Sequence, residues 1–167
     1  MCRADMKCAS LMMAMLIALV AHAQTPPSAA TPAPAAPRAR GPSLALALEA
    51  AQVAAATCMV NGYKTTVLIA DSAGVPVVLL SGDGAIERTQ SIAARKIATL
   101  LSYHASSADA TSPARTDPTT GPPRQGALLL KVGSATIGVI AVSGAPGADK
   151  DEVCAQAAVD KIKDRLR

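Results

Sequence analysis

The chain has 167 residues with 16 basic and 12 acidic side chains, which give it a formal net charge of +4. The basic residues form no run and are not interleaved with aromatic residues, so the composition argues against a nucleic-acid-binding surface. Half of the residues are hydrophobic, but Phe and Trp are absent and the only aromatic residues are Tyr63 and Tyr103. A core must therefore be built from Ala, Val, Leu and Ile, whose small side chains favour close packing of the elements.

Residues 1–23 have the pattern of a secretory signal peptide. The basic residues Arg3 and Lys7 precede an uncharged apolar run over 9–20, and residues 21–23 form a small-x-small cleavage site. The apolar run is shorter than the roughly 20 residues that span a bilayer. The sequence therefore predicts export to the periplasm or the medium, with no membrane span after cleavage.

Residues 24–42 are almost wholly Ala, Pro, Thr and Ser, a composition that favours extended, solvated chain. We interpret this segment as a disordered tether. The remaining residues, 43–167, are enough for one domain with a modest core.

Hydrophobic periodicity predicts seven elements within this domain. Apolar residues three and four apart indicate helices, and β-branched apolar runs bounded by Gly, Asp and Ser indicate strands. In chain order the predicted elements are a helix over 43–61, strands over 65–70 and 75–80, a helix over 85–103, strands over 127–132 and 136–143, and a helix over 149–166. A long polar segment, 105–125, separates the second helix from the third strand. Paired hairpins between helices indicate an α+β sandwich in which helices flank an antiparallel sheet.

Residues 138–152 have the most specific local pattern in the chain, that of a strand, a tight turn and the start of a helix. Apolar strand residues lead into Ser143-Gly144 and Pro146-Gly147, and Asp149 is followed three residues later by Glu152, the spacing of a capped helix start. A strand that ends in such a turn delivers backbone N–H groups to one spot, which predicts a site built from backbone. An ordinary strand-to-helix turn explains the same residues.

Two cysteines, Cys58 and Cys154, remain after removal of residues 1–23. In an exported protein a pair of cysteines predicts one disulfide, which here would join the first and last helices. The alternative is two separately buried thiols. A catalytic thiol is disfavoured because no base lies nearby in the sequence.

Reactive side chains are few in the domain. His104 is its only histidine, which excludes metal sites made of several histidines. It follows a predicted helix and opens the polar segment, so it is either a solvated loop residue or a ligand to haem iron, for which the adjacent Tyr103 is the other candidate.

Three further charged residues have functional and structural interpretations. Asp71 and Asp83 follow successive strands and would lie close together in an acid–base pair, although turns and helix N-caps select Asp for their own reasons. Lys96 lies on an apolar helix, where it would either meet a carboxylate or, as we prefer, extend to solvent.

Several of these motifs together resemble the GlcG/HbpS-like family of haem-binding proteins and the related C-terminal domain of PduO-type proteins. The matching segments are 67–74, 82–85, Ala94-Arg95-Lys96 with Thr99, and 138–147 with Asp151-Glu152. The chain departs from the family at Ser81 and Ala98, where members often carry arginine and tyrosine, so an altered pocket is expected.

The resemblance implies a profilin-like α/β sandwich, homo-oligomerisation and, in some members, binding of haem or another tetrapyrrole. Together with the predicted signal peptide and the single histidine of the domain, it implies an exported, non-catalytic binder of a small ligand, most readily haem, with His104 as the expected axial ligand of the iron. The remaining haem-contacting residues expected from it are Tyr103, Lys96, Ser143 and Gly144. Two alternatives stay open: a self-assembling protein without a small ligand, and a haem-degrading enzyme that uses Asp71, Asp83 and Lys96.

Overall fold

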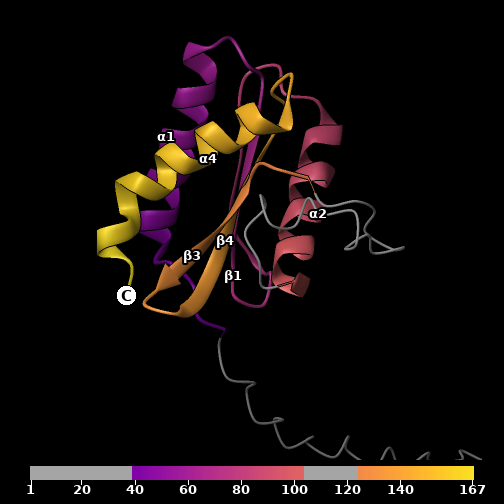
Figure 1. Ribbon diagram of the computed structural model, residues 1–167. Helices are drawn as coiled ribbons and strands as arrows, with labels where there is room; N and C mark the ends of the chain where they lie inside the picture. Colours follow the sequence, from indigo (N-terminus) through magenta and orange to yellow (C-terminus); the bar gives the residue numbers. More distant parts are fainter. Residues whose placement is uncertain (1–38, 104–123) are drawn as a thin grey trace, which may run out of the picture. The chain divides into compact units, whose positions relative to one another are not determined.

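The computed structural model describes residues 39–103 and 124–167, which contain all seven predicted elements (Figure 1). The elements are α1 (Leu44–Val60), β1 (Thr66–Asp71), β2 (Pro76–Ser81), α2 (Glu87–Tyr103), β3 (Ala127–Val132), β4 (Ala135–Ser143) and α4 (Ala148–Ile162), followed by a short 3₁₀ turn, η2 (Lys163–Arg165). The bounds of β3 are the predicted ones, and most other ends move by one or two residues. The predicted last helix is shorter because its final turn tightens into η2.

The four strands form one antiparallel sheet in the order β2-β1-β4-β3. Both predicted hairpins are present, and β1 pairs with β4 so that the two strands at the centre belong to different hairpins. Helices α1 and α4 cover one face of the sheet and α2 covers the other (Figure 1). The predicted α+β sandwich with helices flanking an antiparallel sheet is confirmed.

Small side chains set the spacing of the layer that contains α1 and α4. Four alanines of α1 are completely buried, and two more lie on the facing side of α4. These residues are Ala47, Ala50, Ala51, Ala54, Ala155 and Ala158. Because alanine leaves little side chain between backbones, both helices lie close to the Ile and Val side chains of the central strands, as the lack of Phe and Trp predicts.

The disulfide between Cys58 and Cys154 is present and joins α1 to α4. Both cysteines are buried in the core between the helices and the sheet. The bond spans 96 residues of sequence, so it connects the beginning of the domain to its end. The structure therefore confirms the predicted bridge over the alternative of two separate thiols.

The helix ends differ in how well the sequence predicts them. Gly62, which follows the C-cap residue Asn61, has φ +73°, the left-handed conformation in which many helices end. The N-cap of α4 is Gly147, with no side-chain cap. The predicted capping arrangement of Asp149 and Glu152 is therefore wrong, and Glu152 instead accepts a hydrogen bond from Gly126 N at 3.1 Å.

The predicted signal peptide and most of the predicted tether lie outside the described residues. Residues 39–42 precede the predicted start of the domain, and Arg40 O accepts a hydrogen bond from Ser72 N at 2.8 Å. Within the described ranges, every helix is too short or too polar to cross a bilayer.

Candidate functional site

A cavity of about 230 Å³ lies beside the turn over residues 143–147, where β4 ends and α4 begins. We call it the turn cavity. One wall comes from α2, another from the turn and the first residues of α4, and Arg124 contributes to the lining at the point where the described chain resumes. The lining residues are Thr89, Ile92, Lys96, Arg124, residues 143–148 and Asp151.

The turn is tightly held against the start of β1. Gly144 has φ +125°, and a Cβ at this position would collide with the carbonyl oxygen of Lys64. A side chain is excluded by both the conformation and the space, so glycine is required at this point of the turn. The next residue, Ala145, donates its backbone N–H to Asp151 Oδ1 at 2.9 Å, which ties the turn to the first turn of α4.

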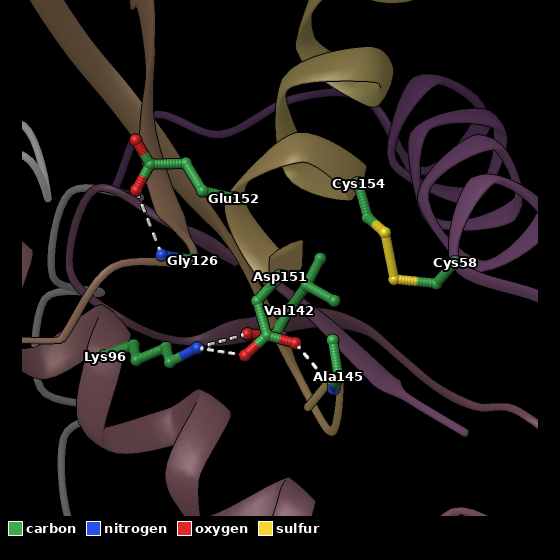
Figure 2. Close-up of polar contacts among 8 residues, drawn as sticks. All are labelled: Cys58, Lys96, Gly126, Val142, Ala145, Asp151, Glu152 and Cys154. Atoms are coloured by element: carbon green, nitrogen blue, oxygen red, sulfur yellow. Dashed lines mark hydrogen bonds and ion pairs between the residues drawn. A yellow bond between two sulfur atoms is a disulfide. The ribbon is translucent and has the colours of Figure 1, made fainter. Parts of the chain in front are cut away.

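Lys96 and Asp151 form a buried ion pair beneath the cavity (Figure 2). Lys96 Nζ donates to Asp151 Oδ2 at 2.7 Å and to the carbonyl oxygen of Val142 at 2.7 Å. Each charged residue is only 4% exposed. Our preferred interpretation of Lys96 as a side chain that extends to solvent is wrong, and the alternative, a carboxylate partner, is the one present.

Burial and pairing act on these two groups in opposite directions. Burial lowers the pKa of Lys96 and raises the pKa of Asp151, while the charge and hydrogen bond of each partner oppose the shift of the other. The neighbouring guanidinium of Arg124 lowers the pKa of Lys96 further. The pair is therefore costly to bury, and two further hydrogen bonds, from Lys96 Nζ to Val142 O and from Ala145 N to Asp151 Oδ1, accompany it.

Gly126 closes over the ion pair. It has φ +102°, and a Cβ there would overlap Lys96 Nζ and lie 2.6 Å from Asp151 Cβ. Its carbonyl accepts from Val142 N at 2.8 Å, and its N–H donates to Glu152 Oε2 at 3.1 Å (Figure 2). The backbone at the start of β3 thus seals the pair on one side.

The turn cavity offers polar groups that suit an anion. Ser143 is 3% exposed, and within the described ranges its hydroxyl makes no hydrogen bond, although it lines the cavity. Arg124 is exposed and also lines the cavity, so the same cavity is lined by a basic residue and by a buried hydroxyl. A carboxylate placed between them would accept charge-assisted hydrogen bonds, and it would satisfy Ser143.

The structure brings together three of the residues expected to contact haem, namely Lys96, Ser143 and Gly144. Tyr103 is half-buried at the end of α2, seven residues after Lys96 and hence on the same face of the helix, about 10 Å along its axis. His104 lies outside the described residues.

Asp71 and Asp83 do not form a pair. Two consecutive antiparallel strands run in opposite directions, so the end of one lies beside the start of the other. Asp71 at the end of β1 and Asp83 after β2 therefore lie at opposite ends of their hairpin. Asp71 Oδ1 accepts from Ala73 N and Val75 N, both at 2.9 Å, which is the turn role of Asp. Asp71, Asp83 and Lys96 line three different cavities, and no metal-binding cluster of His, Cys, Asp or Glu occurs in the described parts of the chain.

Three features of the site were not predicted from the sequence. They are Arg124, Gly126 and the pairing of Asp151 with Lys96. Asp151 fits the favourable placement of acids at a helix N-terminus, which concealed its second role. A signal for the ion pair was available, because Ala93 and Leu100 flank Lys96 at spacings of three and four on the buried face of α2. Arg124 and Gly126 follow the long polar segment, where no periodicity marks a position.

Comparisons with known proteins agree with this geometry. The family model described as "Haem degrading protein HbpS-like" matches residues 43–160. No match was found among curated proteins. The crystal structure of HbpS is 27% identical, with 80% of this chain and 98% of that chain covered and a TM-score of 0.67. A double mutant of HbpS from Streptomyces reticuli is 28% identical to this chain. The match covers 81% of this chain and 99% of that chain, with a TM-score of 0.69.

A more distant structure has the same fold. The PduOC:heme complex is 18% identical to this chain, covers 71% of it and 92% of its own chain, and has a TM-score of 0.62. At this identity the likeness concerns the fold alone. The match of the family model over residues 43–160, together with the HbpS structures, shows that the chain belongs to the HbpS-like family.

Proposed function

We propose that the protein binds haem or a related tetrapyrrole at the turn cavity. The observation that carries this proposal is that one cavity is lined by both Arg124 and the Ser143 hydroxyl, which has no hydrogen-bond partner among the described residues, in a chain that belongs to the HbpS-like family. A heme complex of a protein with the same fold adds support.

The described residues fit the acidic side chains of a tetrapyrrole. The turn cavity, at about 230 Å³, is smaller than the roughly 300–1,000 Å³ of pockets that enclose a whole small molecule. It has room for a carboxylate, which Arg124 and Ser143 would hold. Lys96 supports the wall of the cavity and is not an iron ligand, because its ammonium group already donates to Asp151 and Val142.

Tyr103 and His104 are the candidate iron ligands. Haem iron in proteins is held by His or Tyr among other residues, and the bound iron supplies a centre for redox change or for binding small molecules. Tyr103 is the last residue of α2 and lies about 10 Å along the helix axis from Lys96, which lines the turn cavity. His104 is the next residue in the chain.

We propose binding without turnover as the role of this site. Lys96 and Asp151 engage one another, and Asp71 is engaged in its own turn, so these groups are poorly placed for acid–base work on a ligand. The third acidic candidate, Asp83, lines a different cavity.

We further propose that the protein is exported after cleavage of residues 1–23. The Cys58–Cys154 disulfide supports this, since such bonds persist in oxidising compartments. Intact-mass measurement of protein from the periplasm or the medium should give a chain that begins at Gln24 with both cysteines oxidised. An uncleaved chain found only inside the cell would refute export.

A homo-oligomer is part of the proposal. Leu44 and Leu48 are 60% and 45% exposed on the outer side of α1, four residues apart and hence on one face. Light scattering after size-exclusion chromatography should show a multiple of the monomer mass that falls in a Leu48→Lys variant. A monomer at all concentrations would contradict this assembly.

Titration with hemin tests the haem proposal. Purified protein should develop a saturable Soret shift at micromolar hemin, and the shift should change position in His104→Ala or in Tyr103→Phe, whichever residue ligates iron. An unshifted spectrum in the unsubstituted protein would refute haem binding. A shift that neither substitution alters would refute the assignment of both ligands.

A further inference from the structure

A second cavity, of about 380 Å³, lies between the C-terminal half of α1 and the β1–β2 hairpin. We call it the α1 cavity. The backbone of Lys64 and Thr65 lies against Gly144, so the two cavities are neighbours at one end of the sheet. They share no lining residue, which makes the α1 cavity a separate site.

The walls of the α1 cavity are mainly apolar. Ala55, Ala56 and Met59 of α1 face Leu80 of β2, and Tyr63 adds an aromatic ring. Its volume falls in the roughly 300–1,000 Å³ range of small-molecule sites. The alanines matter here, because larger side chains at positions 55 and 56 would fill the space.

A buried polar group lies in this apolar lining. Thr65 is 2% exposed and lines the cavity, yet its hydroxyl makes no hydrogen bond within the described ranges. A buried hydroxyl without a partner is costly, because it has given up water without a replacement. A ligand with one polar end would supply the missing partner.

Charge near the cavity favours an anionic end. Lys64 lines the cavity and extends over Gly84, while Lys150 Nζ lies 5.9 Å from the centre of the Tyr63 ring. Neither lysine forms an ion pair in the described parts of the chain, and Asp83 is the one carboxylate in the lining. Lys64 in the lining and Lys150 beside the Tyr63 ring therefore place two cations near this cavity against the one carboxylate of Asp83.

We propose that the α1 cavity binds a small amphipathic anion, with its apolar body against Ala55, Met59 and Leu80. The carboxylate of this ligand accepts hydrogen bonds from Lys64 and from the Thr65 hydroxyl. This site is independent of haem binding, because no residue of the turn cavity takes part in it.

The chain provides its own probe for this site. It contains no Trp, and its only tyrosines are Tyr63 and Tyr103, so a Tyr103→Phe background leaves Tyr63 as the sole fluorophore. Decanoate, below its micelle concentration, should change Tyr63 emission saturably. Decyltrimethylammonium, with the same chain and the opposite charge, should bind at least about tenfold more weakly, since a charge-assisted hydrogen bond contributes roughly 1.5–3 kcal/mol.

Matched variants locate the ligand. Lys64→Gln should weaken decanoate binding about tenfold, whereas Lys131→Gln on the exposed side of β3 should not. Ala56→Phe should abolish binding by filling the cavity. Ala45→Phe adds the same ring to an exposed position near the other end of α1 and should leave binding intact.

Several results would overturn the proposal. Equal affinity for both surfactants would contradict the anionic end, and decanoate binding that survives Ala56→Phe would place the ligand elsewhere. Loss of binding in Ala45→Phe as well would indicate that decanoate coats the apolar side of α1 or competes with a second copy of the chain. Ser143→Leu, which fills the turn cavity, should abolish hemin binding alone. If it also abolishes decanoate binding, the two sites are one.

Discussion

Lys96 and Asp151 lie 55 positions apart in the sequence, yet their side chains meet at 2.7 Å in the interior of the protein. Through this contact α2 is joined to α4, and through the further bonds to Val142 O and Ala145 N both helices are joined to β4 and the turn (Figure 2). The shape of the turn cavity therefore depends on one ion pair.

Removal of one member of the pair should be more damaging than removal of both. Lys96→Met leaves the carboxylate of Asp151 buried without its cation, which should reduce the free energy of unfolding by about 3–5 kcal/mol. The double variant Lys96→Met/Asp151→Leu should lose less than the sum of the two single changes. Urea unfolding with the disulfide intact measures all four proteins, and strict additivity would show that the pair contributes no coupling.

The pair also predicts a pH dependence. Burial raises the pKa of Asp151 in the folded protein, so the folded state binds this proton more tightly than the unfolded state. The contribution of Asp151 to stability is then largest below its unfolded pKa of about 3.8 and declines as the pH rises through the folded value. The difference in unfolding free energy between the unsubstituted protein and Asp151→Asn should fall as the pH rises through this window. A difference that grows would reverse the sign of the shift.

Gly126→Ala tests the contact that seals the pair. The substitution places a methyl group against Lys96 Nζ and Asp151 Cβ in a left-handed backbone conformation. Gly133→Ala is the matched control, because Gly133 has φ +59° with nothing within 4 Å of the added carbon. Thermal unfolding should show Gly126→Ala to be less stable than Gly133→Ala by about 1–3 kcal/mol, the range for overpacking. Equal losses would mean that backbone conformation alone requires glycine at 126.

The disulfide should stabilise the domain strongly. A bond that closes about 100 residues of chain contributes about 4–5 kcal/mol in the loop-entropy account, as an upper value. Cys58→Ala/Cys154→Ala should therefore unfold at a much lower urea concentration than the unsubstituted protein under non-reducing conditions. A loss below about 1 kcal/mol would show that the unfolded chain gains little freedom from removal of the bond.

Local patterns were enough to predict the elements, because periodicity and turn residues act within a few positions. The disulfide was predicted from the cysteine count, because only Cys58 and Cys154 remain after removal of residues 1–23. The strand pairing β1–β4 and the contact of Lys96 with Asp151 depend on segments far apart in the chain, which no local pattern encodes. The location of Asp71 and Asp83 at opposite ends of the hairpin could have been predicted, because it follows from the antiparallel hairpin that the sequence predicts.

The candidate site was predicted only in part, because local patterns mark some of its residues and not others. Ser143 and Gly144 stand out because a turn needs small residues, and the structure places both at the cavity. Arg124 could not be identified, because it follows a long polar segment and reaches the cavity only through the path of the chain. Gly126 was hidden because its requirement for glycine comes from side chains on α2 and α4.

Hemin binding by charge-reversed variants tests most directly whether a tetrapyrrole is held at the turn cavity. Arg124→Glu places a carboxylate at the cavity, and Arg95→Glu makes the same change at an exposed position on the outer side of α2. We expect the Soret titration of Arg124→Glu to show at least about tenfold weaker binding, from the loss of a charge-assisted bond and the repulsion that replaces it. Arg95→Glu should bind hemin as the unsubstituted protein does. Equal affinities of all three proteins would contradict the turn cavity as the site.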